Sequence, residues 1–220
     1  MITLVVAPHP DDEVLGVGGT LLRRKQEGAT IGWLIMTNIN VESGWHSETV
    51  EQRKNEIAKI SEFFGFDSVF ELGFTTTQLD LVPMGDLVGA VSDALRVFAP
   101  TEVFLPHSSD IHSDHRITFE AVASAAKWFR CPSIKRILTY ETLSETEFGL
   151  VSGQGFKPNV FLNIDGFLEG KLRAMDIYSS EAGLFPFPRS SEAISALATF
   201  RGSSSGFKAA EAFELLREIG

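Results

Sequence analysis

Short apolar segments alternate with helix-periodic segments along this chain, and this alternation constrains the fold more than any other feature. Segments rich in β-branched and aromatic residues have the length of strands, at 2–7, 30–37, 68–72, 102–106, 136–140 and 159–164. Amphipathic segments with a helical period lie between most of them, at 14–27, 48–64, 85–98 and 115–129. The pattern is therefore strand, helix, strand, helix over more than half of the chain.

Continuously apolar strands separated by helices predict a mostly parallel sheet, because parallel strands need long crossover connections and are buried on both faces. The sequence therefore predicts an α/β fold, a three-layer α/β/α sandwich with a Rossmann-like, mostly parallel sheet. After residue 166 the alternation stops. We expect a helix at 168–180, a loop around Pro186 and Pro188, a Gly/Ser-rich stretch at 201–206 and a closing helix at 209–218. No stretch has the composition of a linker, so we expect one domain over 1–220, in which about 166–220 forms helices and loops around the core.

The charge and cysteine content narrow the expected partners and location. A formal net charge of −10 repels phosphate backbones and anionic lipid, and no run of Lys or Arg offsets it, so nucleic acid is not an expected partner. The apolar segment 1–7 is far shorter than the roughly 20 residues that cross a bilayer, so we expect a strand there and no membrane span. The single cysteine, Cys131, fits a cytoplasmic location. A homo-oligomer is left open.

A first cluster of polar residues, Pro-His-Pro-Asp-Asp-Glu at 8–13, directly follows the first predicted strand. Open α/β sheets hold their sites at the carboxyl ends of such strands. Imidazole and carboxylate are ligands that suit Zn²⁺. Because the neighbouring carboxylates of Asp11 and Asp12 point in different directions, one can bind a metal while the other stays free as a base. The alternative is a helix N-terminus where acidic residues interact favourably with the dipole.

A second cluster, His-Ser-Asp-His at 112–115, follows the fourth predicted strand. His112 and His115 are three residues apart at the predicted start of a helix, so both can face one cleft. Asp114 can accept a hydrogen bond from a histidine N–H, which would fix its tautomer and favour the imidazolium. Both clusters should open at the same edge of the sheet. Three protein ligands from two loops, with a fourth position for water, would form a catalytic zinc site.

Two further features concern the helices and loops around this edge. Arg53 lies in an apolar helical stripe, so its guanidinium needs a polar partner: either Glu56 in a structural pair, or a substrate group in the cleft. The segment 16–20 (Gly-Val-Gly-Gly-Thr) lacks the third glycine of a dinucleotide fingerprint, because Leu21 stands there; its small residues instead predict close packing of the helix on the sheet. The long loops 38–46 and 145–155 are candidate substrate-facing flaps.

The two clusters resemble the motifs of the PIG-L/LmbE-like zinc-dependent N-deacetylases of amino sugars. That family opens with a motif of the Ala-His-Pro-Asp-Asp-Glu type, seen here at 8–13, and carries a second motif, His-x-Asp-His, seen here at 112–115. Weaker matches extend the resemblance over nearly all of the chain, among them Arg53 with Glu56, and Ala-Glu-Ala-Phe at 210–213.

The resemblance implies a metal centre and a base. His9, Asp12 and His115 would bind Zn²⁺, or another divalent ion such as Fe²⁺, and Asp11 would be the general base. Bound zinc lowers the pKa of a water to about 7, which supports the same assignment on chemical grounds.

The resemblance also implies roles for three more residues. His112, oriented by Asp114, would be the electrophile and acid, and Arg53 would line the sugar pocket. The implied function is hydrolysis of the N-acetyl group of an N-acetylated amino sugar or sugar conjugate, such as an N-acetylglucosamine derivative, in glycan biosynthesis. The small-molecule substrate would release acetate.

Two alternatives remain: an amidase that cleaves a larger sugar-linked amide, and a non-catalytic sugar-binding protein. The free carboxylate of Asp11 argues against the second alternative. Ser113, Asp110 and Glu181 stand where relatives carry other residues, so the sequence leaves the identity of the substrate open.

Overall fold

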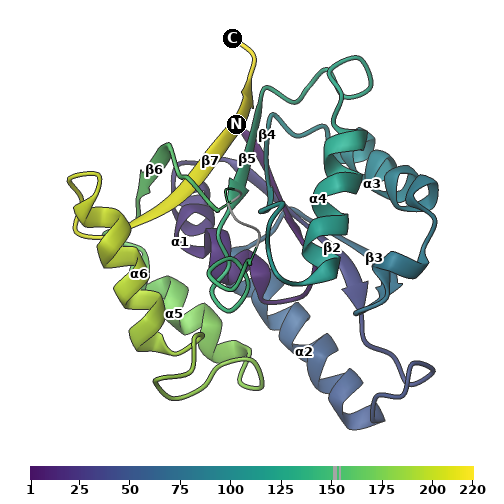
Figure 1. Ribbon diagram of the computed structural model, residues 1–220, viewed down its shortest axis with the longest axis horizontal. Coiled ribbons are helices and arrows are strands. Elements are labelled where there is room, and N and C mark those ends of the chain that lie inside the picture. The colour runs from purple at the N-terminus through teal and green to yellow at the C-terminus, as the bar shows by residue number, and fades with distance from the viewer. Residues whose placement is uncertain (151–152, 154) are drawn as a thin grey trace.

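The computed structural model describes residues 1–150, 153 and 155–220, and these residues contain one seven-stranded sheet in the order β3-β2-β1-β4-β5-β7-β6 (Figure 1). The strands are β1 (Ile2–Ala7), β2 (Thr30–Asn38), β3 (Ser68–Thr75), β4 (Glu102–Pro106), β5 (Arg136–Tyr140), β6 (Val160–Asn163) and β7 (Ala210–Glu218). The helices are α1 (Asp12–Gln26), α2 (Ser47–Phe64), α3 (Met84–Phe98), α4 (Ser113–Ala125), α5 (Leu168–Ile177) and α6 (Ser191–Ser203), with a short 3₁₀ turn at Leu79–Leu81.

The pairing of the strands confirms the predicted α/β class. The strands β3, β2, β1, β4 and β5 pair in parallel, and β7 runs antiparallel to both β5 and β6. Helices α1 to α4 occupy the connections that the parallel pairing requires. The sheet is therefore mostly parallel, as predicted, with its antiparallel part confined to the last strands.

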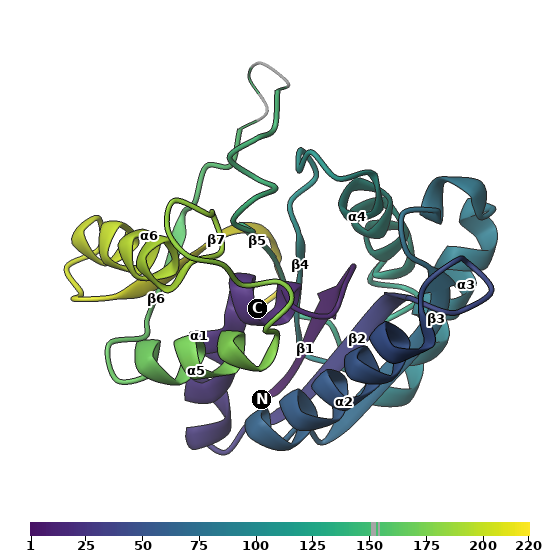
Figure 2. The same cartoon turned by 90° about the horizontal axis from the view of Figure 1, so that it is seen from below.

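Side chains of β1 alternate between two apolar cores, and this alternation defines the three layers. Leu4 and Val6 pack in the core beneath α3 and α4, whereas Val5 and Ala7 pack in the core beneath α1, α2 and α5. Figure 2 shows α1, α2 and α5 gathered on the opposite side of the sheet from α3 and α4. The three-layer sandwich is confirmed. Within the described part of the chain, no helix has the length and apolar character to cross a membrane.

The prediction of a closing helix at 209–218 is wrong, because this segment is strand β7. Its alanine, glutamate and leucine residues are strong helix formers, but intrinsic propensity is a weak force against tertiary pairing. Phe213 pairs with Tyr140 on one side and with Val160 on the other, so the backbone of β7 is hydrogen-bonded along both edges. Helix α6 was not predicted; the Ser190 hydroxyl caps its start by accepting a hydrogen bond of 3.1 Å from the backbone N–H of Ala193.

Close packing of α1 confirms the interpretation of its glycines. A Cβ atom on Gly16 would overlap the ring of Tyr140, and one on Gly19 would lie 2.8 Å from Ile164. The Tyr140 hydroxyl in turn donates to the carbonyl of Val6 at 2.9 Å. These contacts hold the start of α1 directly against the carboxyl end of β1, where the first polar cluster lies.

Candidate active site

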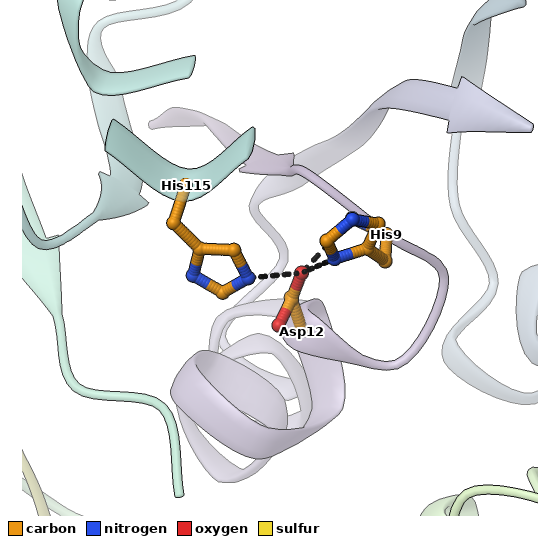
Figure 3. Close-up of side chains that lie close together, drawn as sticks. All are labelled: His9, Asp12 and His115. Atoms are coloured by element: carbon orange, nitrogen blue, oxygen red, sulfur yellow. Dashed lines mark hydrogen bonds and ion pairs between the residues drawn. The ribbon is translucent and has the colours of Figure 1, made fainter. Parts of the chain in front are cut away.

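Two loops meet at the carboxyl edge of the sheet, because β1 and β4 are parallel neighbours. The first loop carries His9 and leads into α1, which begins at Asp12; the second leads into α4, which carries His115. One ligand atom of each of these three residues lies within 4.8 Å of the others (Figure 3). Figure 3 shows the Asp12 carboxylate between the two imidazole rings.

Both ring nitrogens of His9 and of His115 lie near carboxylates: one nitrogen of each ring is near Asp12, and the other is near a carboxylate of its own. Asp12 Oδ2 lies 3.4 Å from His9 Nδ1 and 3.3 Å from His115 Nε2. On the far sides of the rings, His9 Nε2 lies 3.0 Å from Asp114 Oδ2, and His115 Nδ1 lies 2.9 Å from Asp110 Oδ2. Histidines that ligate metals almost always bond a carboxylate, carbonyl or water through their other nitrogen. The donor set and its outer partners therefore fit a divalent ion of the zinc type.

A second group of possible ligands overlaps the first. His9, His112 and Asp114 also place ligand atoms within 4.8 Å of one another. The Asp114 carboxylate, however, already accepts backbone N–H bonds from Thr77 at 2.7 Å and Leu79 at 3.2 Å. These bonds anchor Asp114 as an orienting partner of His9, so the first group is the better metal site.

Asp114 does not act on His112 as predicted. The backbone N–H of Asp114, not its carboxylate, contacts His112, donating to Nδ1 at 3.1 Å. Burial, together with the charges of the nearby His9 and His115, lowers the pKa of His112 to about 4, which favours a neutral ring at pH 7. Because Nδ1 accepts a hydrogen bond, the neutral ring carries its proton on Nε2. The expectation of an imidazolium at this position is corrected to a neutral hydrogen-bond donor.

The Asp11 carboxylate stands beside the metal group without belonging to it. Asp11 has a φ of 131°, which is uncommon for a residue other than glycine. This backbone conformation costs about 1–3 kcal/mol. Its Oδ2 accepts a hydrogen bond of 2.7 Å from Arg189 Nη1. Burial raises the pKa of Asp11 to about 7, and the charge of Asp12 raises it too, while Arg189 opposes the shift. A carboxyl group that titrates near neutral pH is suited to general-base chemistry.

A cavity of about 380 Å³ opens over these residues, a size typical of small-molecule sites. Its lining includes the three histidines of the two clusters and both aspartates of the first, together with Trp45, Arg53, Glu145, Glu181 and Arg189. Both predicted flap loops contribute, the first through Trp45 and the second through Glu145. Residues 151, 152 and 154 of the second loop lie outside the described residues.

Arg53 forms the predicted structural pair and also lines the cavity. Its Nε lies 3.2 Å from Glu56 Oε2, which is the structural pair. Its guanidinium also reaches the cavity, where Nη1 donates to the carbonyl of Pro10 at 2.7 Å and Nη2 bonds Glu181. Its polar partners are thus protein groups on both sides, and the residue also lines the cavity.

Comparison with known proteins agrees with this geometry. The family model PIG-L, described as GlcNAc-PI de-N-acetylase, matches residues 4–126, which span both polar clusters. The chain belongs to the PIG-L family. Since the match covers more than half of the chain, the resemblance predicted from the two motifs is confirmed.

Relatives of this PIG-L protein cover most of its length. It is similar to "Uncharacterized deacetylase YaiS" of Escherichia coli (strain K12), with 29% identity over 183 residues, 80% of this chain and 90% of the relative. It is also similar to "Diacetylchitobiose deacetylase" of Thermococcus kodakarensis, with 24% identity over 98% of this chain and 83% of the relative. Among solved structures, the conserved protein TT1542 from Thermus thermophilus matches with a TM-score of 0.79 and 31% identity, over 99% of this chain and 96% of the other.

Three residues of the site escaped the sequence-based prediction of this PIG-L protein's active site. Asp110 was noted only as a departure from relatives, yet it orients His115; the carboxylate five residues before a ligand histidine was the available signal. Glu145 and Arg189 lie in loops without periodicity, where no local pattern marks them. They reach the site only through the tertiary fold.

Four groups of the metal-free site, three of them buried and His9 partly exposed, bind their protons more tightly than usual. Burial lowers the pKa of the two ligand histidines, but their carboxylate partners outweigh it, raising His9 to about 9 and His115 to about 10. Burial raises the pKa of Glu13 to about 8, against a hydrogen bond of 2.7 Å from the Tyr178 hydroxyl. Asp11, at about 7, is the fourth.

The metal-free protein is therefore expected to lose stability as the pH rises from 6 to 9. Each of these groups binds its proton more tightly in the folded than in the unfolded chain, so folding takes up protons. For His9 the stabilising contribution is complete below pH 6.5 and is lost as the pH rises through about 9. Melting temperatures measured in chelator at pH 6, 7, 8 and 9 should fall steadily. A zinc-loaded sample, whose ligand histidines have already given up their protons, should show a weaker fall, and equal slopes would contradict the prediction.

Proposed function

We propose that this protein is a zinc-dependent hydrolase that removes the N-acetyl group from an N-acetylated amino sugar or sugar conjugate and releases acetate. The observation that carries this proposal is the buried Asp11 carboxylate, which borders the same cavity as the metal group but is not one of its ligands. A protein that only binds sugar has no need of such a base. The deacetylase names of the relatives, one of them acting on diacetylchitobiose, support the substrate class.

His9, Asp12 and His115 would hold the ion. A divalent ion bound there supplies a Lewis acid that polarises the acetamide carbonyl and increases the acidity of a water. Asp114 and Asp110 keep the two imidazoles turned with one nitrogen toward Asp12. This outer support matters because its loss typically costs 10- to 100-fold in metal affinity or activity.

Asp11 would take the proton from the attacking water. Its pKa of about 7 lets it accept a proton near neutral pH and return it, so the same carboxyl can pass that proton to the leaving amine. Arg189 holds Oδ2, which leaves the other carboxylate oxygen for this exchange.

His112 would stabilise the oxyanion that forms when the acetyl carbonyl oxygen takes up the negative charge. Its Nδ1 is occupied by the backbone N–H of Asp114, so its Nε2–H is the group that can donate into the cavity. One donor of this kind is worth about 10²- to 10³-fold in kcat. Because the ring is neutral, we assign His112 to hydrogen bonding and assign the proton transfer to Asp11.

Arg53 would border the sugar. Its guanidinium is fixed by Pro10 and Glu181, so sugar binding would not pay the entropic cost of ordering a long side chain.

We also propose that the 220 residues form one domain. Strands β1 and β7 support this view, because they come from opposite ends of the chain and lie in the same sheet.

Acetate release from a panel of N-acetylated sugars tests the function. The panel should contain free N-acetylglucosamine, its glycosides, its nucleotide-linked form and diacetylchitobiose. We expect the zinc-loaded protein to release acetate from at least one of them, with activity lost in chelator and restored by Zn²⁺. The Asp11→Asn variant, purified identically, controls for contaminating hydrolases. No acetate from any sugar would contradict the proposal and favour the larger-amide or sugar-binding alternative.

A further inference from the structure

Two polar groups on the cavity wall face each other without a hydrogen bond. Glu145 Oε1 and Arg189 Nη2 lie 4.0 Å apart, beyond hydrogen-bond distance, and both residues line the cavity. Within the described residues, the two atoms form a long ion pair with no hydrogen bond between them, and the other carboxylate oxygen, Glu145 Oε2, is buried without a hydrogen-bond partner. The Glu145 side chain is 12% exposed and the Arg189 side chain is 20% exposed, so both are largely shielded from bulk water.

The Arg189 guanidinium is held in place by its other atoms, and the backbone that carries Glu145 is held in place as well. Arg189 donates through Nε to Ser144 Oγ at 2.9 Å and through Nη1 to Asp11 at 2.7 Å, so its guanidinium plane is fixed. The backbone N–H of Glu145 donates to the Thr142 carbonyl at 3.1 Å, which fixes the turn that carries it. A buried polar group without a partner costs about 1–3 kcal/mol, so a carboxylate with one buried, unpaired oxygen, in an ion pair as long as 4.0 Å, calls for an explanation.

We propose that a hydroxyl group of the substrate bridges this pair, accepting from Arg189 Nη2 and donating to Glu145 Oε1. An oxygen about 2.8 Å from each atom fits within a separation of 4.0 Å. A hydroxyl can donate and accept at once, whereas an ether cannot donate and an ammonium cannot accept. The pair therefore selects a sugar with a free hydroxyl at one ring position. This inference rests on the proposed function and deepens it.

The site also explains why the pair stays open. A direct hydrogen bond between Glu145 Oε1 and Arg189 Nη2 would need the two atoms to come about 1 Å closer. A movement of Arg189 toward Glu145 would strain its 2.7 Å hydrogen bond to Asp11, the proposed base. Arg189 thus contacts both the proposed hydroxyl and the proposed base. The sugar would therefore be recognised directly beside the group that reacts.

A double-mutant cycle between protein and sugar tests the bridge. The panel sugar with the fastest acetate release is compared with its monodeoxy and mono-O-methyl analogues, in the wild type, in Glu145→Ala and in Glu147→Ala. In the wild type, one position should lose about 10- to 100-fold in kcat/KM when its hydroxyl is removed or methylated. In Glu145→Ala the same change should cost less than about threefold, because the partner is already missing.

Glu147→Ala is the matched control. Glu147 lies two residues further along the same loop, is exposed, does not line the cavity and accepts a bond from the Ser144 backbone N–H at 2.6 Å. Glu147→Ala removes one negative charge from the same loop, as Glu145→Ala does. It should nevertheless keep the full wild-type discrimination between the sugar and its deoxy analogue. Glu145→Gln, which preserves the shape of the side chain, should weaken discrimination in the same direction as Glu145→Ala.

Additive losses would overturn the bridge: a deoxy sugar that suffers as much in Glu145→Ala as in the wild type does not use Glu145. Equal loss of discrimination in Glu147→Ala would overturn it as well. A panel from which no sugar yields acetate overturns the proposed function itself, which is a different result from turnover with additive losses.

Discussion

Replacing Asp11 with Asn is expected to lower kcat for deacetylation by about 10²- to 10⁴-fold while the protein still binds its metal. An amide cannot take the proton of the attacking water, so the step assigned to Asp11 is lost. The metal group of His9, Asp12 and His115 does not include Asp11, so metal content should not change. The measurement is kcat at saturating substrate together with elemental analysis of the same sample.

Asparagine is the substitution of choice because it preserves the local structure. Asn shares with Asp a tolerance for positive φ, and the backbone here has a φ of 131°. The amide oxygen of Asn can still accept from Arg189, which now holds the carboxylate at 2.7 Å. The variant also removes a buried ionisable group, so we expect the melting temperature to stay the same or rise. A fall in activity would then report proton transfer.

The Glu181→Gln variant separates this effect from the loss of a charge beside Arg189. Glu181 Oε2 accepts from the same Nη1 atom, at 3.1 Å, and also lines the cavity. If Asp11 is the base, Glu181→Gln should cost less than about tenfold. Equal losses in both variants would mean that the pairing of Arg189 matters and that Asp11 is not the base.

The predictable part of the fold is the part in which each element carries its own signal. Strand β1 is short, apolar and rich in β-branched residues, and helix α2 repeats apolar residues at helical steps. Each can therefore be predicted from its own local sequence. Strand β7 does not, since its composition favours a helix and only its place between β5 and β6 makes it extended. The buried Glu211 of β7 is satisfied by Lys171 at 2.6 Å, a contact that no local pattern predicts.

The candidate site divides in the same way. His9 and His115 follow neighbouring parallel strands, so the topology that places the strands also brings their side chains together. Arg189 meets Asp11 across a sequence separation of 178 residues, from a loop whose path depends on the packing of α5 and α6. The sequence also could not tell that Asp114 uses its backbone on one histidine and its carboxylate on another.

Replacing His115 with Ala is expected to abolish metal binding, whereas replacing His112 with Ala should leave the metal in place and lower kcat by about 10²- to 10³-fold. Two overlapping groups in the structure share His9, and these variants decide between them. His115 Nε2 lies 3.3 Å from Asp12 Oδ2, and Asp110 orients the ring, so the loss of His115 removes a ligand and leaves Asp110 Oδ2 buried without its partner. We expect the loss of affinity to exceed the roughly 100-fold that removal of an outer partner can cost.

Both variants should be purified without added metal and compared by elemental analysis and zinc titration, with His46→Ala as the matched control because His46 is exposed and lies outside both groups. Metal retained in His115→Ala but lost in His112→Ala would assign the ion to the group of His9, His112 and Asp114. Asp114 would then be a ligand, and the oxyanion donor would have to be sought elsewhere. Metal lost in both variants would mean that all three histidines hold the ion together. Because His112 Nδ1 already accepts from the backbone N–H of Asp114, its Nε2 would be the ligand and could not also donate to the oxyanion, so the proposed role of His112 would fail.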